Sequence, residues 1–377
     1  MQKEHSIGYS MAPLILPSDK VIVKKTKTFS INDIVVFKKG PRLIAHRAIY
    51  MSEGRLITKG DNNLKSESIA KNQILGKVEE VKRGKNKIKL SLVYLSQSSV
   101  YLIELKSLTV KFSQTKVNYI LLKGLPLHLL YQGAPPKRLY LDVDILIKKD
   151  DFPKTAGVLE KQGFRPVKPY LFGKVSKHFS QISFVKKVEP FPVIVDIHFE
   201  PAVGFTKATS LNSLIPYLNR YTDHLFRNTF PQEVEGVSFP ILKREEYLLY
   251  LLIHLFHHNF QGPHRMELVD AILRKKNINW HKFENSVNKF AFEDFIYPEI
   301  LLLKKYYSSP FPSEITTKLY PSLTAKILGA IILKWVSPFN KDAKNIERAK
   351  RLFFLFLLAK QPFLKKILLL QNLQKIL

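Results

Sequence analysis

The feature that most constrains the fold is an apolar stretch, residues 138–147, that contains two aspartates. It reads Arg-Leu-Tyr-Leu-Asp-Val-Asp-Ile-Leu-Ile and places Asp142 and Asp144 two residues apart. On a β-strand, residues i and i+2 point to the same face, so the two carboxylates are expected to project together while Val143 and Ile145 pack behind them. Two adjacent ionised carboxylates repel each other, and their burial is costly unless a cation lies between them. The stretch therefore predicts a strand that carries a divalent-metal site.

Composition predicts a folded, strongly basic protein. Of the 377 residues, 45% are hydrophobic and 24% are charged, and a globular chain of this length is expected to form about two or three domains. The 60 Lys and Arg residues outnumber the 31 Asp and Glu residues, which gives a net charge of +29. Such an excess favours a polyanionic partner, namely nucleic acid, nucleotide phosphates or an anionic membrane surface. The alternative is a lysine-rich surface exposed only to solvent.

Three absences narrow the class of protein. The sequence has no cysteine, which excludes disulfides, thiolate nucleophiles and cysteine-ligated zinc. The longest apolar run, residues 352–359, is far shorter than the roughly 18 residues that a transmembrane helix requires. Residues 1–9 contain no apolar segment of the kind found in signal peptides. The sequence therefore predicts a cytoplasmic protein, with peripheral attachment to a membrane as the alternative.

Residues 1–95 predict a small all-β domain. Short apolar segments alternate there with Gly, Pro, Asn and Ser, as strands and turns do. The expected strands are 20–23, 34–37, 43–50, 55–59, 74–81 and 87–92. Three separate segments of this domain contribute Ser10, His46 and Asp61. These residue types are the parts of a nucleophile, its general base and the group that orients the base.

The contexts of these three residues resemble a known family. The motifs are Ser10-Met11-Ala12-Pro13, Asn32-Asp33-Ile34-Val35-Val36-Phe37, His46-Arg47, Lys59-Gly60-Asp61-Asn62-Asn63 and Gly76-Lys77-Val78. In this order, over residues 8–80, they resemble the catalytic core of type I signal peptidases, in the archaeal and endoplasmic-reticulum branch that uses a histidine base. The resemblance implies Ser10 as nucleophile, His46 as general base and Asp61 as its partner, with Glu67 near the position of a further family aspartate.

Several activities are compatible with that resemblance. The family works beside an N-terminal transmembrane helix, which is not expected in this sequence. The alternatives are a cytoplasmic serine peptidase that processes a peptide precursor, a self-cleaving module, or a binding domain without activity.

Residues 96–114 predict a linker that can carry a short helix, because serines interrupt the apolar pattern there. The following region, 115–210, is expected to alternate strands and helices. A strand over 117–122 leads into Lys123-Gly124, and a short helix over 125–131 ends at Gly133. A helix over 152–162 and a strand over 193–199 follow, and the strand carries Asp196 with His198 on the same face.

Asp142, Asp144 and Asp196 predict a two-metal site for phosphoryl or nucleotidyl transfer, provided that their two strands lie side by side. The metals, Mg²⁺ or Mn²⁺, would bridge the phosphates of a nucleoside triphosphate, and Asp196 would deprotonate or orient an acceptor hydroxyl. Lys123 and Arg138 are placed to meet phosphate oxygens. The alternative is that these aspartates are ordinary exposed residues at strand positions.

A second resemblance supports the metal-site interpretation. The motifs are Leu122-Lys123-Gly124, Arg138, Asp142-Val143-Asp144-Ile145-Leu146, Gly163-Phe164 and Val195-Asp196-Ile197-His198. They resemble the uncharacterised nucleotidyltransferase family of the DNA polymerase β-like superfamily, over roughly residues 115–360. The resemblance implies that Asp142, Asp144 and Asp196 are metal ligands and that Gly124 lets the backbone approach the triphosphate. The implied partners are a nucleoside triphosphate and an acceptor, which is a small molecule, a peptide or a protein.

Residues 211–377 predict a helical region. His254, His257 and His258 lie on one side of an expected helix, where they face a nucleotide, cap the helix or, with Asp270, ligate a metal. Two later stretches, 325–336 and 349–377, are apolar with interspersed Lys and Arg and predict packing helices of a bundle. A basic amphipathic helix on an anionic membrane is the alternative for these stretches.

Together these patterns predict an α+β protein in which a small all-β signal-peptidase-like domain precedes a polymerase-β-like nucleotidyltransferase core and a helical bundle. The expected activity is metal-dependent transfer of a nucleotidyl group to an unknown acceptor. The alternatives are a serine endopeptidase that uses Ser10 and His46, and a non-catalytic scaffold in which both sites are vestigial.

Overall fold

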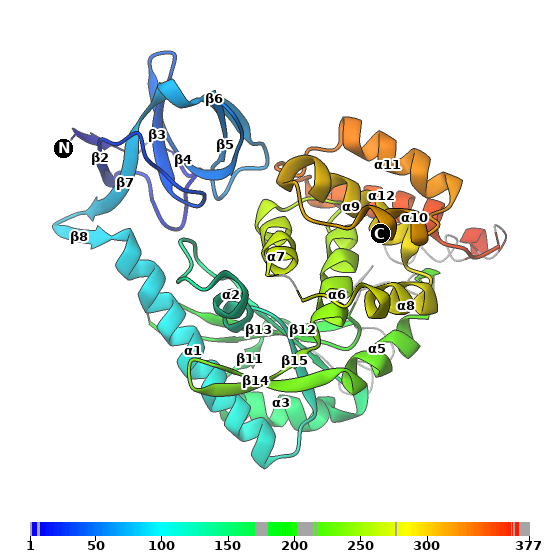
Figure 1. Cartoon of the computed structure of the whole chain (residues 1–377). Coiled ribbons are helices and arrows are strands. Elements are labelled where there is room, and N and C mark those ends of the chain that lie inside the picture. The colour runs from blue at the N-terminus through cyan, green and yellow to red at the C-terminus, as the bar shows by residue number, and fades with distance from the viewer. Residues whose placement is uncertain are drawn as a thin grey trace.

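The structure, a computed structural model, has a β domain, a mixed five-stranded sheet with flanking helices, and a mainly helical region (Figure 1). It describes residues 2–5, 8–169, 180–189, 191–201, 214–215, 217–275, 277–362, 364 and 366–368. None of the helices within these ranges is long and apolar enough to span a membrane.

The β domain is one antiparallel sheet, shown in blue in Figure 1, with strand order β1-β2-β7-β3-β4-β5-β6 and with β8 paired to β7. Its strands are β1 (Gln2–His5), β2 (Lys20–Lys24), β3 (Ile34–Lys39), β4 (Arg42–Met51), β5 (Arg55–Lys59), β6 (Glu67–Ala70), β7 (Ile74–Arg83) and β8 (Asn86–Lys89). Strand β3 is apolar on both faces: Ile34 and Val36 join one apolar cluster, and Val35 and Phe37 join a second. Because successive side chains of a strand point to opposite faces, β3 connects two small cores.

Helix α1 (Leu90–Gln114) spans residues 96–114, where the sequence predicts a linker that can carry a short helix. The helix is longer than expected, because Ser96 and Ser99 lie on its exposed side while the buried residues recur at helical spacing. These buried residues include Tyr94, Tyr101, Leu105, Leu108 and Phe112, which lie on one face. The strand expected over 87–92 is wrong in its second half for the same reason, since α1 begins at Leu90.

The central sheet has the order β11-β12-β13-β10-β9. Its strands are β9 (Tyr119–Lys123), β10 (Val143–Ile147), β11 (Arg165–Pro166), β12 (Gln181–Lys186) and β13 (Val193–His198), and the helices of this segment are α2 (Leu125–Gln132) and α3 (Phe152–Lys161). Strands β10 and β13 are parallel neighbours, and the other pairs in this sheet are antiparallel. The sequence prediction of short strands and helices here is confirmed, including the left-handed Gly133 that ends α2.

The C-terminal part is mainly helical but also contains a hairpin that the sequence analysis missed. Its elements are α5 (Leu218–Arg227), β14 (Thr229–Val234), β15 (Val237–Leu242), α6 (Arg244–His257), α7 (Pro263–Arg274), α8 (Trp280–Phe290), α9 (Glu293–Tyr307), α10 (Ser313–Lys318), α11 (Leu323–Trp335) and α12 (Lys344–Leu358). Glu235 and Gly236 connect β14 to β15 with φ of 51° and 71°. A two-residue turn with both φ values positive is the favoured connection of a β-hairpin, so this stretch cannot continue a helix.

The β domain is docked against the rest of the chain through polar and aromatic contacts. Arg47 Nη1 donates a 2.7 Å hydrogen bond to the carbonyl oxygen of Lys137, in the loop that precedes β10. Tyr50 donates a 2.8 Å hydrogen bond to the carbonyl oxygen of Tyr306, and its ring stacks on Phe339 with centroids 4.7 Å apart. The β domain therefore contacts both the aspartate-bearing segment and the helical region.

Candidate functional site

The pairing of β10 with β13 brings two aspartates together. In this parallel pair Asp144 lies opposite Asp196 and Leu146 lies opposite His198. Asp144, Asp196 and His198 are all buried, and one ligand atom from each lies within 4.8 Å of the others. The metal-site prediction required these two strands to lie side by side, and the register shows that they do.

Basic and amide groups surround the two carboxylates. Asp144 Oδ2 lies 2.8 Å from the Lys123 ammonium, and Asp144 Oδ1 lies 2.6 Å from His198 Nε2. Asp196 Oδ2 accepts a 2.6 Å hydrogen bond from the Gln181 amide. The other oxygen, Asp196 Oδ1, is buried and has no hydrogen-bond partner among the described residues. One buried carboxylate oxygen is therefore available to a cation.

The two aspartates are held in different charge environments. Burial and the nearby charge of Asp144 raise the pKa of Asp196 to about 6. Burial acts in the same direction on Asp144, but Lys123 and His198 outweigh it and hold the pKa of Asp144 well below its usual range. Asp144 is therefore a permanent anion, whereas Asp196 is a better proton acceptor than an ordinary aspartate.

Asp142 lies beside this pair and not within the strand. Strand β10 begins at Val143, so the expectation that Asp142 and Asp144 share one strand face is not met. Although Asp142 is exposed, desolvation by the surrounding protein and repulsion by Asp144 raise its pKa, while Lys123 and Arg265 lower it. The charges of the site therefore act on Asp142. Among the described residues, however, the group whose ligand atoms are close enough to hold a metal consists of Asp144, Asp196 and His198.

Gly124 follows Lys123 at the end of β9 and immediately precedes α2. Its φ is 126°, a conformation that only glycine adopts readily. A Cβ atom at this position would lie 3.2 Å from Val143 Cγ2. The glycine therefore allows the turn to approach the strand that carries Asp144.

Arg138 is held near the site by an aromatic ring. Its guanidinium carbon lies 4.4 Å from the centre of the Tyr140 ring, and its charge lowers the pKa of both His128 and His264, although burial of each ring is the larger cause. The expected contact of Arg138 with phosphate remains a prediction.

The sequence analysis missed two cations at the site. Arg265, in α7, is electrostatically coupled to Asp142 and Asp144, and burial lowers its pKa. Lys59, at the end of β5, has its pKa lowered by burial and by the charges of Lys341 and Arg265. An added Cβ at Gly262 would lie 2.4 Å from the guanidinium of Arg265. The action of Arg265 on the aspartates depends on a long-range arrangement that the sequence does not reveal.

The three histidines of α6 lie near the same charges without forming the metal site with Asp270. Burial and the charges of Lys123 and Arg265 keep the pKa values of His254, His257 and His258 well below their usual range. Asp270 instead accepts hydrogen bonds of 2.7 Å from both Arg274 and Ser309. The three rings are therefore neutral side chains in a cationic environment. Their expected role, in facing a nucleotide or capping the helix, stays a prediction.

The serine, histidine and aspartate of the β domain are not arranged as the sequence predicts. His46 Nδ1 lies 2.6 Å from Glu67 Oε1, whereas Asp61 makes two hydrogen bonds, of 2.7 and 2.6 Å, with Arg47. Asp61 neutralises a buried arginine because burial of an unpaired guanidinium is costly. The histidine therefore has Glu67 as its carboxylate partner, and the expected role of Asp61 is corrected.

Ser10 lies against the turn that follows β5. Its carbonyl oxygen accepts a 2.8 Å hydrogen bond from the backbone N–H of Asn62, and a Cβ atom on Gly60 would lie 2.9 Å from Ser10 Cβ. The same turn contains Asn63, whose amide nitrogen lies 3.5 Å from His46 Nε2. Ser10 and His46 thus contact the same short turn.

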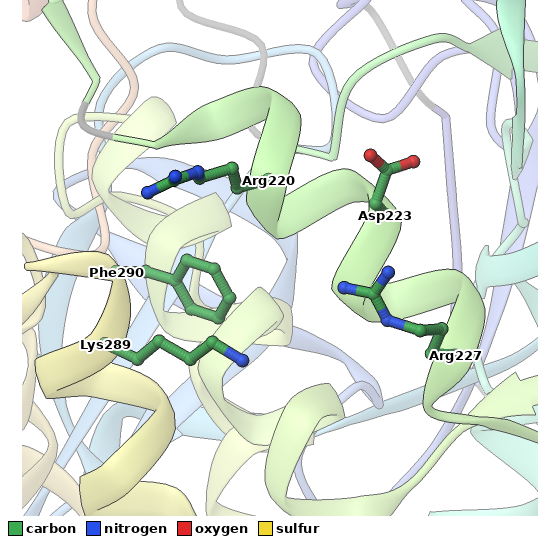
Figure 2. Close-up of a pocket in the computed structure, with 5 residues that line it drawn as sticks. All are labelled: Arg220, Asp223, Arg227, Lys289 and Phe290. Carbon is green, nitrogen blue, oxygen red and sulfur yellow. The ribbon is translucent and has the colours of Figure 1, made fainter.

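A separate hollow of about 220 Å³ lies between α5 and α8, away from the aspartates. Figure 2 shows its lining, which comprises Arg220, Asp223 and Arg227 from α5 and Lys289 and Phe290 from α8. The three basic side chains outnumber the single carboxylate. This surface adds to the positive charge of the molecule but shares no residue with the candidate site.

Comparison with known proteins places most of the chain in one family. The model of a family described as uncharacterised nucleotidyltransferase matches residues 89–308, more than half of the chain. The matched range excludes Ser10, His46 and Asp61. No curated protein matches.

A solved structure, the lincomycin-bound lincosamide antibiotic adenylyltransferase LnuA, aligns at 16% identity. The alignment covers 46% of this chain and 94% of that chain, with a TM-score of 0.28. A TM-score this low does not establish a shared fold.

Glu267 provides a pH-dependent test of how the β domain is docked. Burial raises the pKa of this α7 carboxyl to about 7, although Arg138 and a hydrogen bond with Asn32 of the β domain oppose the shift. The folded state therefore binds a proton more tightly than the unfolded state, and stability is lost as the pH rises toward and through 7. We predict that Glu267→Gln lessens this loss. Between pH 5 and pH 8, the unfolding temperature of the wild type should fall by about a few degrees more than that of Glu267→Gln.

Differential scanning calorimetry at both pH values measures this difference. Glu53→Gln, on the exposed surface, is the control and should follow the wild type. Identical pH profiles of the wild type and Glu267→Gln would contradict the burial of an ionising Glu267 at this interface.

Proposed function

Because the chain belongs to the family of uncharacterised nucleotidyltransferases, we propose that it catalyses metal-dependent transfer of a nucleotidyl group from a nucleoside triphosphate to an acceptor. The observation that carries this proposal is the register of β10 with β13, which sets Asp144 opposite Asp196. Two carboxylates on neighbouring strands, with basic side chains around them, are suited to hold the divalent cation that is bound to a nucleoside triphosphate.

The donor set fits a hard divalent cation. Asp144 and Asp196 offer carboxylate oxygens, which Mg²⁺ and Mn²⁺ prefer, and Asp196 Oδ1 lacks another partner among the described residues. Lys123 provides the positive charge beside Asp144 in the structure. When bound, the cation would neutralise the phosphates and the charge that develops on them. His198, which is 2.6 Å from Asp144, would orient that carboxylate.

The surrounding residues have separate roles in this proposal. Lys123, Arg265 and Lys59 would attract the triphosphate, and Gly124 would let the backbone come close to it. Asp196 would accept the proton of the acceptor hydroxyl. The acceptor oxygen then forms a bond to the α-phosphorus, the bond from that phosphorus to the bridging oxygen breaks, and pyrophosphate leaves. The acceptor class remains a small molecule, a peptide or a protein.

We predict that Asp144→Asn and Asp196→Asn each reduce nucleotidyl transfer by about a hundredfold or more, because each removes an anionic ligand while keeping the shape of the side chain. The assay incubates the protein with Mg²⁺, each α-labelled nucleoside triphosphate and a cell extract, and then detects the labelled product. Asp223→Asn, in the separate hollow, is the matched control and should retain activity.

Isothermal titration with ATP, GTP, CTP and UTP in the presence of Mg²⁺ complements this assay. A folded wild type that binds none of the four, or an Asp144→Asn variant as active as the wild type, would refute the proposed function.

A serine peptidase activity of the β domain is the second candidate function. The contact between His46 and Glu67 favours it, because a carboxylate on Nδ1 holds an imidazole in the orientation that a general base needs. Burial lowers the pKa of His46, although Glu67 opposes this, so the ring is a neutral base at pH 7. In this candidate function Ser10 is the nucleophile.

We predict that Ser10→Ala and His46→Ala abolish cleavage of a peptide library, as measured by mass spectrometry, whereas Asp144→Asn leaves cleavage unchanged. The aspartate variant controls for general loss of folding. Equal cleavage by the wild type and Ser10→Ala would rule out the peptidase assignment.

A further inference from the structure

Helix α11 exposes a continuous apolar row. Leu323, Ile327, Ile331 and Trp335 recur every four residues, and 73%, 54%, 49% and 74% of their surfaces are exposed. Residues four apart lie on the same side of a helix. At a rise of about 1.5 Å per residue, the row is roughly 18 Å long. Scattered exposed apolar residues are ordinary, whereas an aligned row of this length marks an interaction surface.

The opposite face of α11 is fixed against the protein. Ala325, Leu328, Gly329 and Ile332 are buried. A Cβ atom on Gly329 would lie 2.9 Å from Leu301 Cδ1 of α9, so the two helices pack with little space between them. Figure 1 shows α11 at the periphery of the helical region. Because the buried face holds the helix in place, α11 cannot rotate its exposed row into the core.

Aromatic residues stand at both ends of this row. Tyr320, just before the helix, is 82% exposed, and Trp335 is its last residue. Tyr and Trp side chains favour the interface between hydrocarbon and water, whereas Leu and Ile favour the hydrocarbon beneath it. The order aromatic, aliphatic, aliphatic, aliphatic, aromatic therefore matches a helix that lies flat in a bilayer surface.

The charges of α11 have a single sign. Lys326 and Lys334 are both exposed, and the helix contains no acidic residue. The Lys334 ammonium lies 5.3 Å from the centre of the Trp335 ring, so a positive charge accompanies the aromatic end of the row. Two copies of this face would bring lysines against lysines, which opposes self-association. An anionic surface is the complementary partner.

We propose that α11 docks the protein on an anionic membrane surface, with Leu323, Ile327, Ile331 and Trp335 inserted among the lipid chains and Lys326 and Lys334 at the headgroups. The net charge of +29 strengthens the attraction over a longer range. This docking is peripheral, because the helix is packed on α9 along its other face. It would place the nucleotidyl-transfer site near a membrane without requiring a spanning segment.

Trp335 permits a direct test. The chain has two tryptophans, and Trp280→Phe leaves Trp335 as the fluorescent reporter. Vesicles of phosphatidylcholine with phosphatidylglycerol should shift its emission to shorter wavelength, and brominated lipid chains should quench it. Vesicles of phosphatidylcholine alone should have a much weaker effect. If anionic vesicles neither shift nor quench the emission of Trp335, the proposal is overturned.

Sedimentation with the same vesicles tests the row itself. We expect the double substitution Ile327→Ser with Ile331→Ser to lower the partition coefficient by about tenfold or more, and Lys326→Glu with Lys334→Glu to abolish the preference for anionic lipid. The matched control is Ile103→Ser with Val110→Ser, which alters two exposed apolar residues of α1 and should bind as the wild type does. Circular dichroism checks that each variant is folded.

Two further results would overturn the proposal. In one, the isoleucine variant sediments with anionic vesicles as the wild type does. In the other, light scattering shows that the wild type forms dimers which the isoleucine variant loses, with no vesicle binding by either protein. The apolar row would then be an interface between copies of this chain.

Discussion

The parallel pairing of β10 with β13 is the interaction on which the rest of the site depends. It sets two carboxylates opposite each other in a buried position, where their repulsion is stronger than it would be in water. Lys123 and His198 offset that repulsion on the side of Asp144. Asp196 retains a raised pKa and one unpartnered oxygen among the described residues. The pair is therefore arranged to receive positive charge.

The need for positive charge beside the two carboxylates accounts for the basic residues that other elements contribute. Helix α7 contributes Arg265, whose charge acts on Asp142 and Asp144, and the β domain contributes Lys59, whose pKa burial and the charge of Arg265 lower. The β domain also holds the loop before β10 through Arg47 and Lys137. The β domain thus contacts the segment that carries the aspartates, whether or not its own serine is catalytic.

The sequence predicted the strands that local apolar patterns determine. The alternation of apolar residues located most of the β-domain strands but missed the short β1 and β6. The two strands that carry Asp144 and Asp196 followed from their apolar runs. Residues whose role depends on long-range contacts were missed. The charge of Arg265 acts on the aspartates although α7 is far from them in the sequence, and Asp61 pairs with Arg47 because a buried guanidinium requires a counter-charge. The helix within the expected linker is longer than predicted because its apolar residues have the period of a helix, which serines at other positions obscured.

The most direct test of the account is Mn²⁺ binding, measured by electron paramagnetic resonance without nucleotide. The account predicts that the wild type binds Mn²⁺ and that Asp144→Asn and Asp196→Asn each lose this binding. Lys123→Met should bind Mn²⁺ at least as tightly as the wild type, because the ammonium and the cation compete for the same carboxylate. Equal Mn²⁺ binding by the wild type and both aspartate variants would contradict the claim that these carboxylates form the metal site.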